Sequence, residues 1–170
     1  GAFTNLGGVP AAHIASWNGS AWEPLGAGVA GHVLVLTCWD GALYAGGRFA
    51  QAGGASASRV ARWNGAAWHP LGEGCDDDVN AMIVWRGSLY AGGVFTRAGG
   101  GSAAGLARWD GARWQEVGGG ISGACPPSVN ALAAGADGLY VGGDFARADA
   151  VEVQNIARWD GTNWHALGGG

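Results

Sequence analysis

The segment Trp63-Asn64-Gly65-Ala66-Ala67-Trp68 has three further copies in this chain of 170 residues, each with the pattern Trp-Asn/Asp-Gly-x-x-Trp. The first tryptophan of the pattern recurs after 46, 46 and 50 residues. Such a period is typical of repeat proteins, in which one unit cannot bury its own apolar face and must stack on a neighbour. Identical placement in every unit predicts a structural role for eight tryptophans: Trp17, Trp22, Trp63, Trp68, Trp109, Trp114, Trp159 and Trp164.

The same pattern divides the chain into three complete units and one partial unit within a single domain, residues 1–170. The complete units are residues 29–74, 75–120 and 121–170, and the partial unit is residues 1–28. Phe3 supports this division, because it matches Phe49, Phe95 and Phe145 of the complete units.

Each complete unit contains four short strand-like runs. In residues 29–74 they are 33–36, 43–49, the run ending at Trp63 and the run containing Trp68. Asp40-Gly41 and Asn64-Gly65 predict two-residue hairpin turns, because Asn, Asp and Gly tolerate positive φ. A helical repeat is excluded, because Gly and turn dipeptides interrupt every segment. Four antiparallel strands in about 46 residues predict an all-β fold of β-propeller blades.

Three complete blades and a partial one should not close a ring stably, because most closed propellers have about four to eight blades. Open sheet edges also invite pairing with another chain. We therefore expect further blades, or assembly of several copies of this chain, to complete the ring.

The predicted long loops all lie on the face opposite the short turns, and loops of this kind usually carry binding residues. Acidic residues that break the repeat on this face are the candidate ligand-binding residues: Glu73, Asp76, Asp77, Asp78, Asp144, Asp149 and Glu152. They lack the spaced Asp-x-Asp-x-Asp-Gly pattern of a calcium loop, so solvated charge is the favoured interpretation. The four histidines lack the spacing of a zinc site, and we expect no metal and no cofactor.

The composition excludes some classes of function. The net charge is −4, and the nine basic residues are all arginines scattered singly, which argues against nucleic acid as a partner. No apolar run approaches the roughly 20 residues of a membrane helix, so membrane insertion is not expected. The absence of lysine beside abundant Arg, Ala and Gly is compatible with a GC-rich bacterial genome.

Two of the three cysteines suggest a disulfide. Cys75 and Cys125 each lie four residues before the valine that opens the first strand of adjacent units, and equivalent loops of neighbouring blades can approach each other. A Cys75–Cys125 disulfide is therefore a hypothesis, and it would fit an extracellular or cell-surface protein. Cys38, at the end of a first strand, is expected to be a buried free thiol.

The run Leu43-Tyr44-Ala45-Gly46-Gly47-Arg48-Phe49, followed by an aromatic residue ending the third strand and a tryptophan on the fourth, resembles the kelch repeat. The resemblance covers essentially the whole chain and implies a propeller of the kelch and galactose-oxidase class. The aromatic spacing is shorter than in kelch units, and Trp replaces the usual Tyr. These departures indicate a bacterial kelch-like relative rather than a eukaryotic adaptor.

The Trp-Asp-Gly-x-x-Trp segments are also similar to part of the small fucose-binding propeller lectins. In those lectins an Arg and a Glu beside a Trp bind the sugar. Arg62, Arg108 and Arg158 precede their tryptophans here, but no Glu recurs with them.

The sequence favours a non-catalytic secreted or surface scaffold that binds a protein partner through its long-loop face. A carbohydrate-binding propeller and a fragment of a galactose-oxidase-like enzyme are the alternatives. The absence of a Gly-x-Ser-x-Gly motif and of metal-ligand spacing argues against an enzyme.

Overall fold

The computed structural model describes residues 1–168, and within them the fold is all-β, without helices. The first complete unit is an antiparallel sheet of β5 (Val29–Trp39), β6 (Ala42–Ala52), β8 (Val60–Trp63) and β9 (Trp68–Pro70), in that order. The short strand β7 (Ala55–Ser56) pairs with the end of β6. The four predicted strands are therefore present, and each pairs with its neighbour in sequence.

The other two complete units repeat this topology. The second sheet contains β10 (Val79–Trp85), β11 (Ser88–Gly93), β14 (Leu106–Trp109) and β15 (Trp114–Glu116). The third contains β17 (Ser128–Ala134), β18 (Leu139–Asp144), β21 (Ile156–Trp159) and β22 (Trp164–Ala166). Of these four sheet strands the partial unit has the last two, β3 (Ala15–Trp17) paired with β4 (Trp22–Pro24).

The long loops contain small hairpins that the sequence analysis did not predict. They are β1 (Asn5–Leu6) with β2 (Val9–Pro10), and β12 (Arg97–Ala98) with β13 (Gly101–Ser102). In the third unit, β19 (Arg147–Ala148) pairs with both β16 (Ile121–Ser122) and β20 (Val151–Glu152). These two-residue strands lack an apolar alternation long enough to be recognised.

The two predicted types of hairpin turn differ in the structure. The Asp40-Gly41 turn has two residues, both with positive φ (47° and 70°), as predicted. The turn from Trp63 to Trp68 has four residues, so the prediction of a two-residue turn was wrong there. The Asn64 side chain accepts hydrogen bonds from the amides of Ala66 and Ala67, both 2.9 Å long, and this stabilises the longer loop.

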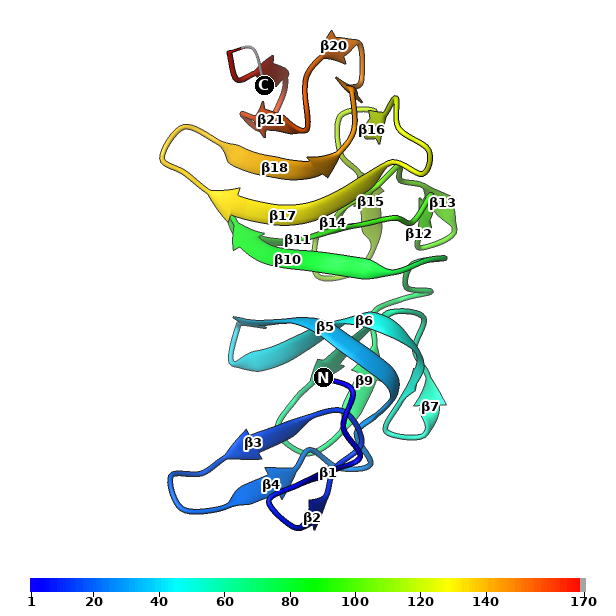
Figure 1. Cartoon of the computed structure of the whole chain (residues 1–170), viewed down its shortest axis with the longest axis vertical. Coiled ribbons are helices and arrows are strands. Elements are labelled where there is room, and N and C mark those ends of the chain that lie inside the picture. The colour runs from blue at the N-terminus through cyan, green and yellow to red at the C-terminus, as the bar shows by residue number, and fades with distance from the viewer. Residues whose placement is uncertain (169–170) are drawn as a thin grey trace.

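The sheets follow one another from the partial unit at the bottom of Figure 1 to the third complete unit at the top. Strand β10 contacts β5 on one side and β17 on the other. The first glycine of the glycine pair in the second strand permits this approach. A Cβ on Gly46 would lie 2.7 Å from Val79 Cγ1 of the next unit, closer than normal side-chain contacts.

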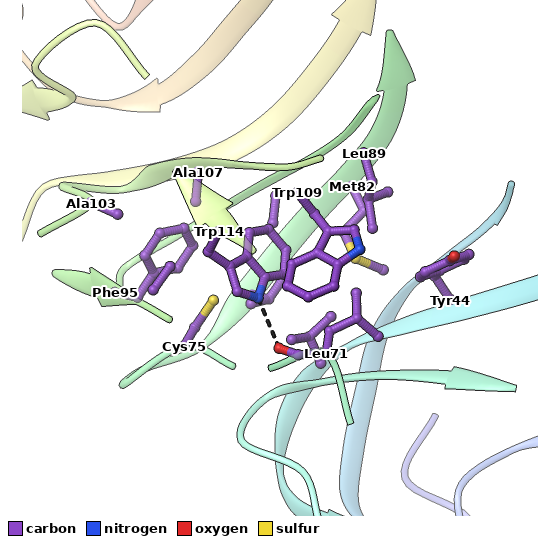
Figure 2. Packing of buried hydrophobic residues seen from close by; sticks show 14 of the residues in the cluster. Tyr44, Leu71, Cys75, Met82, Leu89, Phe95, Ala103, Ala107, Trp109 and Trp114 are labelled. Atoms are coloured by element: carbon purple, nitrogen blue, oxygen red, sulfur yellow. Dashed lines mark hydrogen bonds between the residues drawn. The ribbon is translucent and has the colours of Figure 1, made fainter. Parts of the chain in front are cut away.

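A second contact joins the units through the tryptophans. The Trp114 ring belongs to the second complete unit, and its Nε1–H donates a 2.9 Å hydrogen bond to the Leu71 carbonyl of the first (Figure 2). Trp68 donates the equivalent bond to Leu25, and Trp164 donates to Gly118, one residue after the equivalent position Val117. The rings of Trp68, Trp114 and Trp164 are buried at these joints, as expected of structural residues, whereas Trp17 and Trp22 of the partial unit are exposed.

Candidate functional site

The acidic loop 73–78 is built around hydrogen bonds within the chain. The Asp76 carboxylate accepts bonds from the Thr96 amide (2.9 Å), the Thr96 hydroxyl (2.7 Å) and the Arg97 amide (2.9 Å). Burial alone would raise the pKa of Asp76, but the bonds from Arg97 and Thr96 outweigh it and lower that pKa. Asp76 therefore holds two loops together, while Glu73 and Asp77 are exposed.

Asp78 is buried rather than solvated, contrary to the favoured interpretation of this loop as free charge. Its Oδ2 lies 2.6 Å from Arg48 Nε, which belongs to the preceding unit, and its Oδ1 lies 3.9 Å from Arg59 Nε. A charge that loses water must be paired, and these two arginines provide the pairing. Asp78 is thus part of the joint between the first and second complete units.

The three acidic candidates of the third unit lie apart from that loop. The Asp144 carboxylate accepts long hydrogen bonds from Ser128 (3.3 Å) and Asn130 (3.4 Å), and Glu152 pairs with Arg147 at 3.4 Å. Asp149 has a positive φ of 50° in a turn. Within residues 1–168, no group of three or more His, Cys, Asp or Glu residues is arranged to hold a metal ion.

All three thiols are free in this structure, so it contains no Cys75–Cys125 disulfide, and Cys38 is free as predicted but exposed rather than buried. Cys75 is buried and fills the core position that Val29 and Ile121 occupy in the other units, whereas Cys125 lies exposed in the inserted segment 121–128. The four-residue insertion separates two positions that only appeared equivalent in the sequence. Cys38 is exposed because it lies on the outward-facing side of β5.

A groove of about 360 Å³ lies between the first and second complete units, near the Asp40-Gly41 turn. Its walls include the rings of Trp39 and Tyr44 from the first unit and Trp109 from the second, together with Asp40, Arg62 and His69. This size and mixture of aromatic and polar groups is typical of sites for small ligands. This groove was not predicted from the sequence, which pointed to the long-loop face as the binding face.

Strand register brings three of these side chains into one row. Tyr44 on β6 lies opposite Arg62 on β8, and Arg62 lies opposite His69 on β9. Burial raises the pKa of Tyr44, and the positive charge of Arg62 opposes that change. The buried Nε of Arg62 has no hydrogen-bond partner within residues 1–168, and the same holds for the Nε of Arg108 at the equivalent position of the second unit.

The equivalent groove of the next joint is closed by an arginine. Arg86 occupies the position of Asp40 in the second unit, and its Nη1 donates a 2.7 Å hydrogen bond to the Asp160 carbonyl. Its guanidinium carbon lies 4.4 Å from the centre of the Trp85 ring. The shorter Asp40 cannot span the joint, so the first groove is open. A comparison of residue 40 with residue 86 could have revealed this difference in the sequence.

In residues 1–168 no helix is both long and apolar enough to cross a lipid bilayer. Comparisons with protein-family models, with curated proteins and with solved structures find no match to this chain.

Proposed function

We propose that this chain is a non-catalytic binding scaffold of kelch-like β-propeller blades, and that it holds a carbohydrate in the groove between its first two complete units. The open groove carries the proposal, because the corresponding space at the next joint is filled by Arg86. Four-stranded antiparallel units in sequential order support the blade assignment. A secreted or cell-surface location fits this function.

The groove matches the chemistry of a sugar ring. The CH face of a sugar is apolar and packs on aromatic rings such as Trp39 and Trp109, while its hydroxyls both donate and accept hydrogen bonds. The guanidinium group of Arg62 carries hydrogen-bond donors and the carboxylate of Asp40 carries acceptors, and both residues line the groove. A volume of about 360 Å³ lies at the small end of known ligand sites, which favours a short glycan.

The experiment is a glycan-array screen followed by titration of tryptophan fluorescence with the glycans that bind. The variant Asp40→Arg places in the groove the residue that closes the next joint, so we expect it to abolish binding while the fold is kept. The matched control is Asp77→Arg, which makes the same charge change at an exposed position of the long-loop face. Absence of glycan binding, or binding that survives in Asp40→Arg, would overturn the proposal.

A protein partner on the long-loop face is the second candidate. The supporting observation is a hollow of about 330 Å³ in the third unit, between the inserted segment 121–128 and residues 144–155. Asp144 lines it, so a basic side chain of a peptide fits best. Selection of peptides from a displayed library tests this function, and the selected peptides should lose binding to an Asp144→Arg variant.

A further inference from the structure

The two joints between complete units differ in the charge that they hold. We call the joint of the first with the second complete unit the first joint, and that of the second with the third the second joint. At the second joint, the Arg86 guanidinium carbon lies 4.4 Å from the centre of the Trp85 ring, and Arg86 Nη1 donates a 2.7 Å hydrogen bond to the Asp160 carbonyl. The chain itself therefore places a cation there, between an aromatic face and a backbone oxygen of the next unit.

The groove at the first joint has the same aromatic wall. Trp39 ends β5 as Trp85 ends β10, and each packs beside a tyrosine of the following strand. The ring centroids of Trp39 and Tyr44 lie 5.7 Å apart, and those of Trp85 and Tyr90 lie 5.6 Å apart. The groove thus keeps the ring on which the second joint holds its cation.

The facing wall is also alike. Gly111 lines the groove and occupies the repeat position of Gly161, which follows Asp160 in the third unit. Asp110 and Asp160 open the same kind of loop, in which each carboxylate accepts hydrogen bonds from the amides two and three residues later. The Asp110 carbonyl is therefore the counterpart of the oxygen that accepts a hydrogen bond from Arg86.

The charge at the turn is reversed, because Asp40 places a carboxylate where the second unit has the guanidinium of Arg86. Arg62 is a cation in the same groove, but Arg108 holds the equivalent position at the second joint. There, burial raises the pKa of Tyr90, and the positive charges of both Arg108 and Arg86 oppose that change. An arginine at this position is thus compatible with a second positive charge on the neighbouring tryptophan.

We propose that the carbohydrate held in the groove at the first joint is an amino sugar, whose ammonium group lies on the Trp39 ring and pairs with Asp40. This inference rests on the proposed carbohydrate function and names the chemical class of its ligand. The ammonium takes the place that the guanidinium of Arg86 has at the second joint, and the Asp110 carbonyl accepts one of its hydrogen bonds. A neutral sugar uses the aromatic wall alone, and N-acetylation of the amine removes the charge.

Oligosaccharides of chitosan, chitin and cellulose test this charge, because they share one backbone and differ in one substituent of each ring, which is an ammonium, an acetamide or a hydroxyl. Tryptophan fluorescence is titrated in a buffer that keeps the amine protonated. Chitosan should bind about tenfold more tightly than the other two, as expected for a cation–π contact together with an exposed ion pair. Calorimetric titration should show one chitosan site in the wild-type chain and two in Arg86→Asp, since that variant gives the second joint the carboxylate of the first.

The variant Asp40→Asn removes the carboxylate charge and nearly keeps the side-chain volume. We expect it to weaken chitosan binding by about fivefold, the upper end for an exposed ion pair, and so to reduce the preference for chitosan over chitin. Because the net charge of −4 attracts any cation, Asp77→Asn is the matched control. It removes the same charge at an exposed position of the long-loop face and should keep the wild-type preference.

Circular dichroism establishes that each variant is folded before its binding is measured. Equal binding of chitosan and chitin by the wild type, a chitosan preference that Asp40→Asn keeps, or a single site in Arg86→Asp would overturn the amino-sugar assignment. So would a lack of chitosan binding when the glycan array finds other binders. These results leave the carbohydrate proposal in place, whereas an array on which no glycan binds would overturn both.

Discussion

Substitution of Gly92 by alanine tests the close approach of successive units. Gly92, on β11, has a strand conformation without positive φ. A Cβ at this position would lie 2.9 Å from Val129 Cβ and closer still to Val129 Cγ1, on β17 of the next unit. Ordinary side-chain contacts are about 3.4–4 Å, so the third unit must retreat or Val129 must leave its rotamer.

Gly142 is the natural control, because it occupies the same repeat position on β18 and also lacks positive φ. A Cβ on Gly142 would have no neighbour closer than 3.9 Å. Both Gly→Ala changes remove unfolded-state entropy, which stabilises a protein by about 0.4–1 kcal/mol. Only Gly92→Ala adds overpacking, which costs about 1–3 kcal/mol. The difference between the two variants therefore isolates the steric cost of the joint.

The assay is urea unfolding monitored by tryptophan fluorescence. The urea concentrations at the unfolding midpoints are compared using one shared slope of unfolding free energy against urea concentration. We expect Gly142→Ala to unfold at or above the wild-type midpoint and Gly92→Ala to unfold below it. Val129→Ala should offset part of the cost of Gly92→Ala, because the two positions share one contact. Equal destabilisation by the two alanine variants would refute the reasoning, since it would place the cost in the strand itself.

Three further predictions concern single side chains. Trp114→Phe should lower the free energy of unfolding by about 1–3 kcal/mol, because it leaves the buried Leu71 carbonyl unpaired; an unchanged urea midpoint would contradict this. Burial raises the pKa of the Cys75 thiol to about 12, so mass spectrometry after alkylation at neutral pH should find two labelled cysteines in the folded protein and three after unfolding. A hydrogen bond from His165 and, to a smaller extent, hydrogen bonds from backbone amides hold the pKa of Asp160 below its usual range. That contribution to stability is present above pH about 4 and is lost as the pH falls further, so Asp160→Asn should show a weaker pH dependence of its urea midpoint on the acid side.

The period of the tryptophan pattern and the turn dipeptides were sufficient to predict the all-β fold, the four strands of each unit and their sequential pairing. These features depend on local backbone preference and on alternation along a strand, both of which are written in consecutive residues. The local patterns also predicted the length of the Asp40-Gly41 turn. They failed at Asn64, where side-chain hydrogen bonds to the backbone select a four-residue loop.

The candidate site depended on contacts between units, which no single repeat contains. Asp78 was expected to be solvated, but Arg48 of the preceding unit pairs with it. Cys75 and Cys125 are separated by an insertion whose path only the folded chain shows. The groove beside Arg62 is open because one side chain, Asp40, is too short to cross a joint. Periodicity therefore determines what each unit is, while tertiary packing decides which spaces between units are filled, since that depends on side chains distant in the sequence.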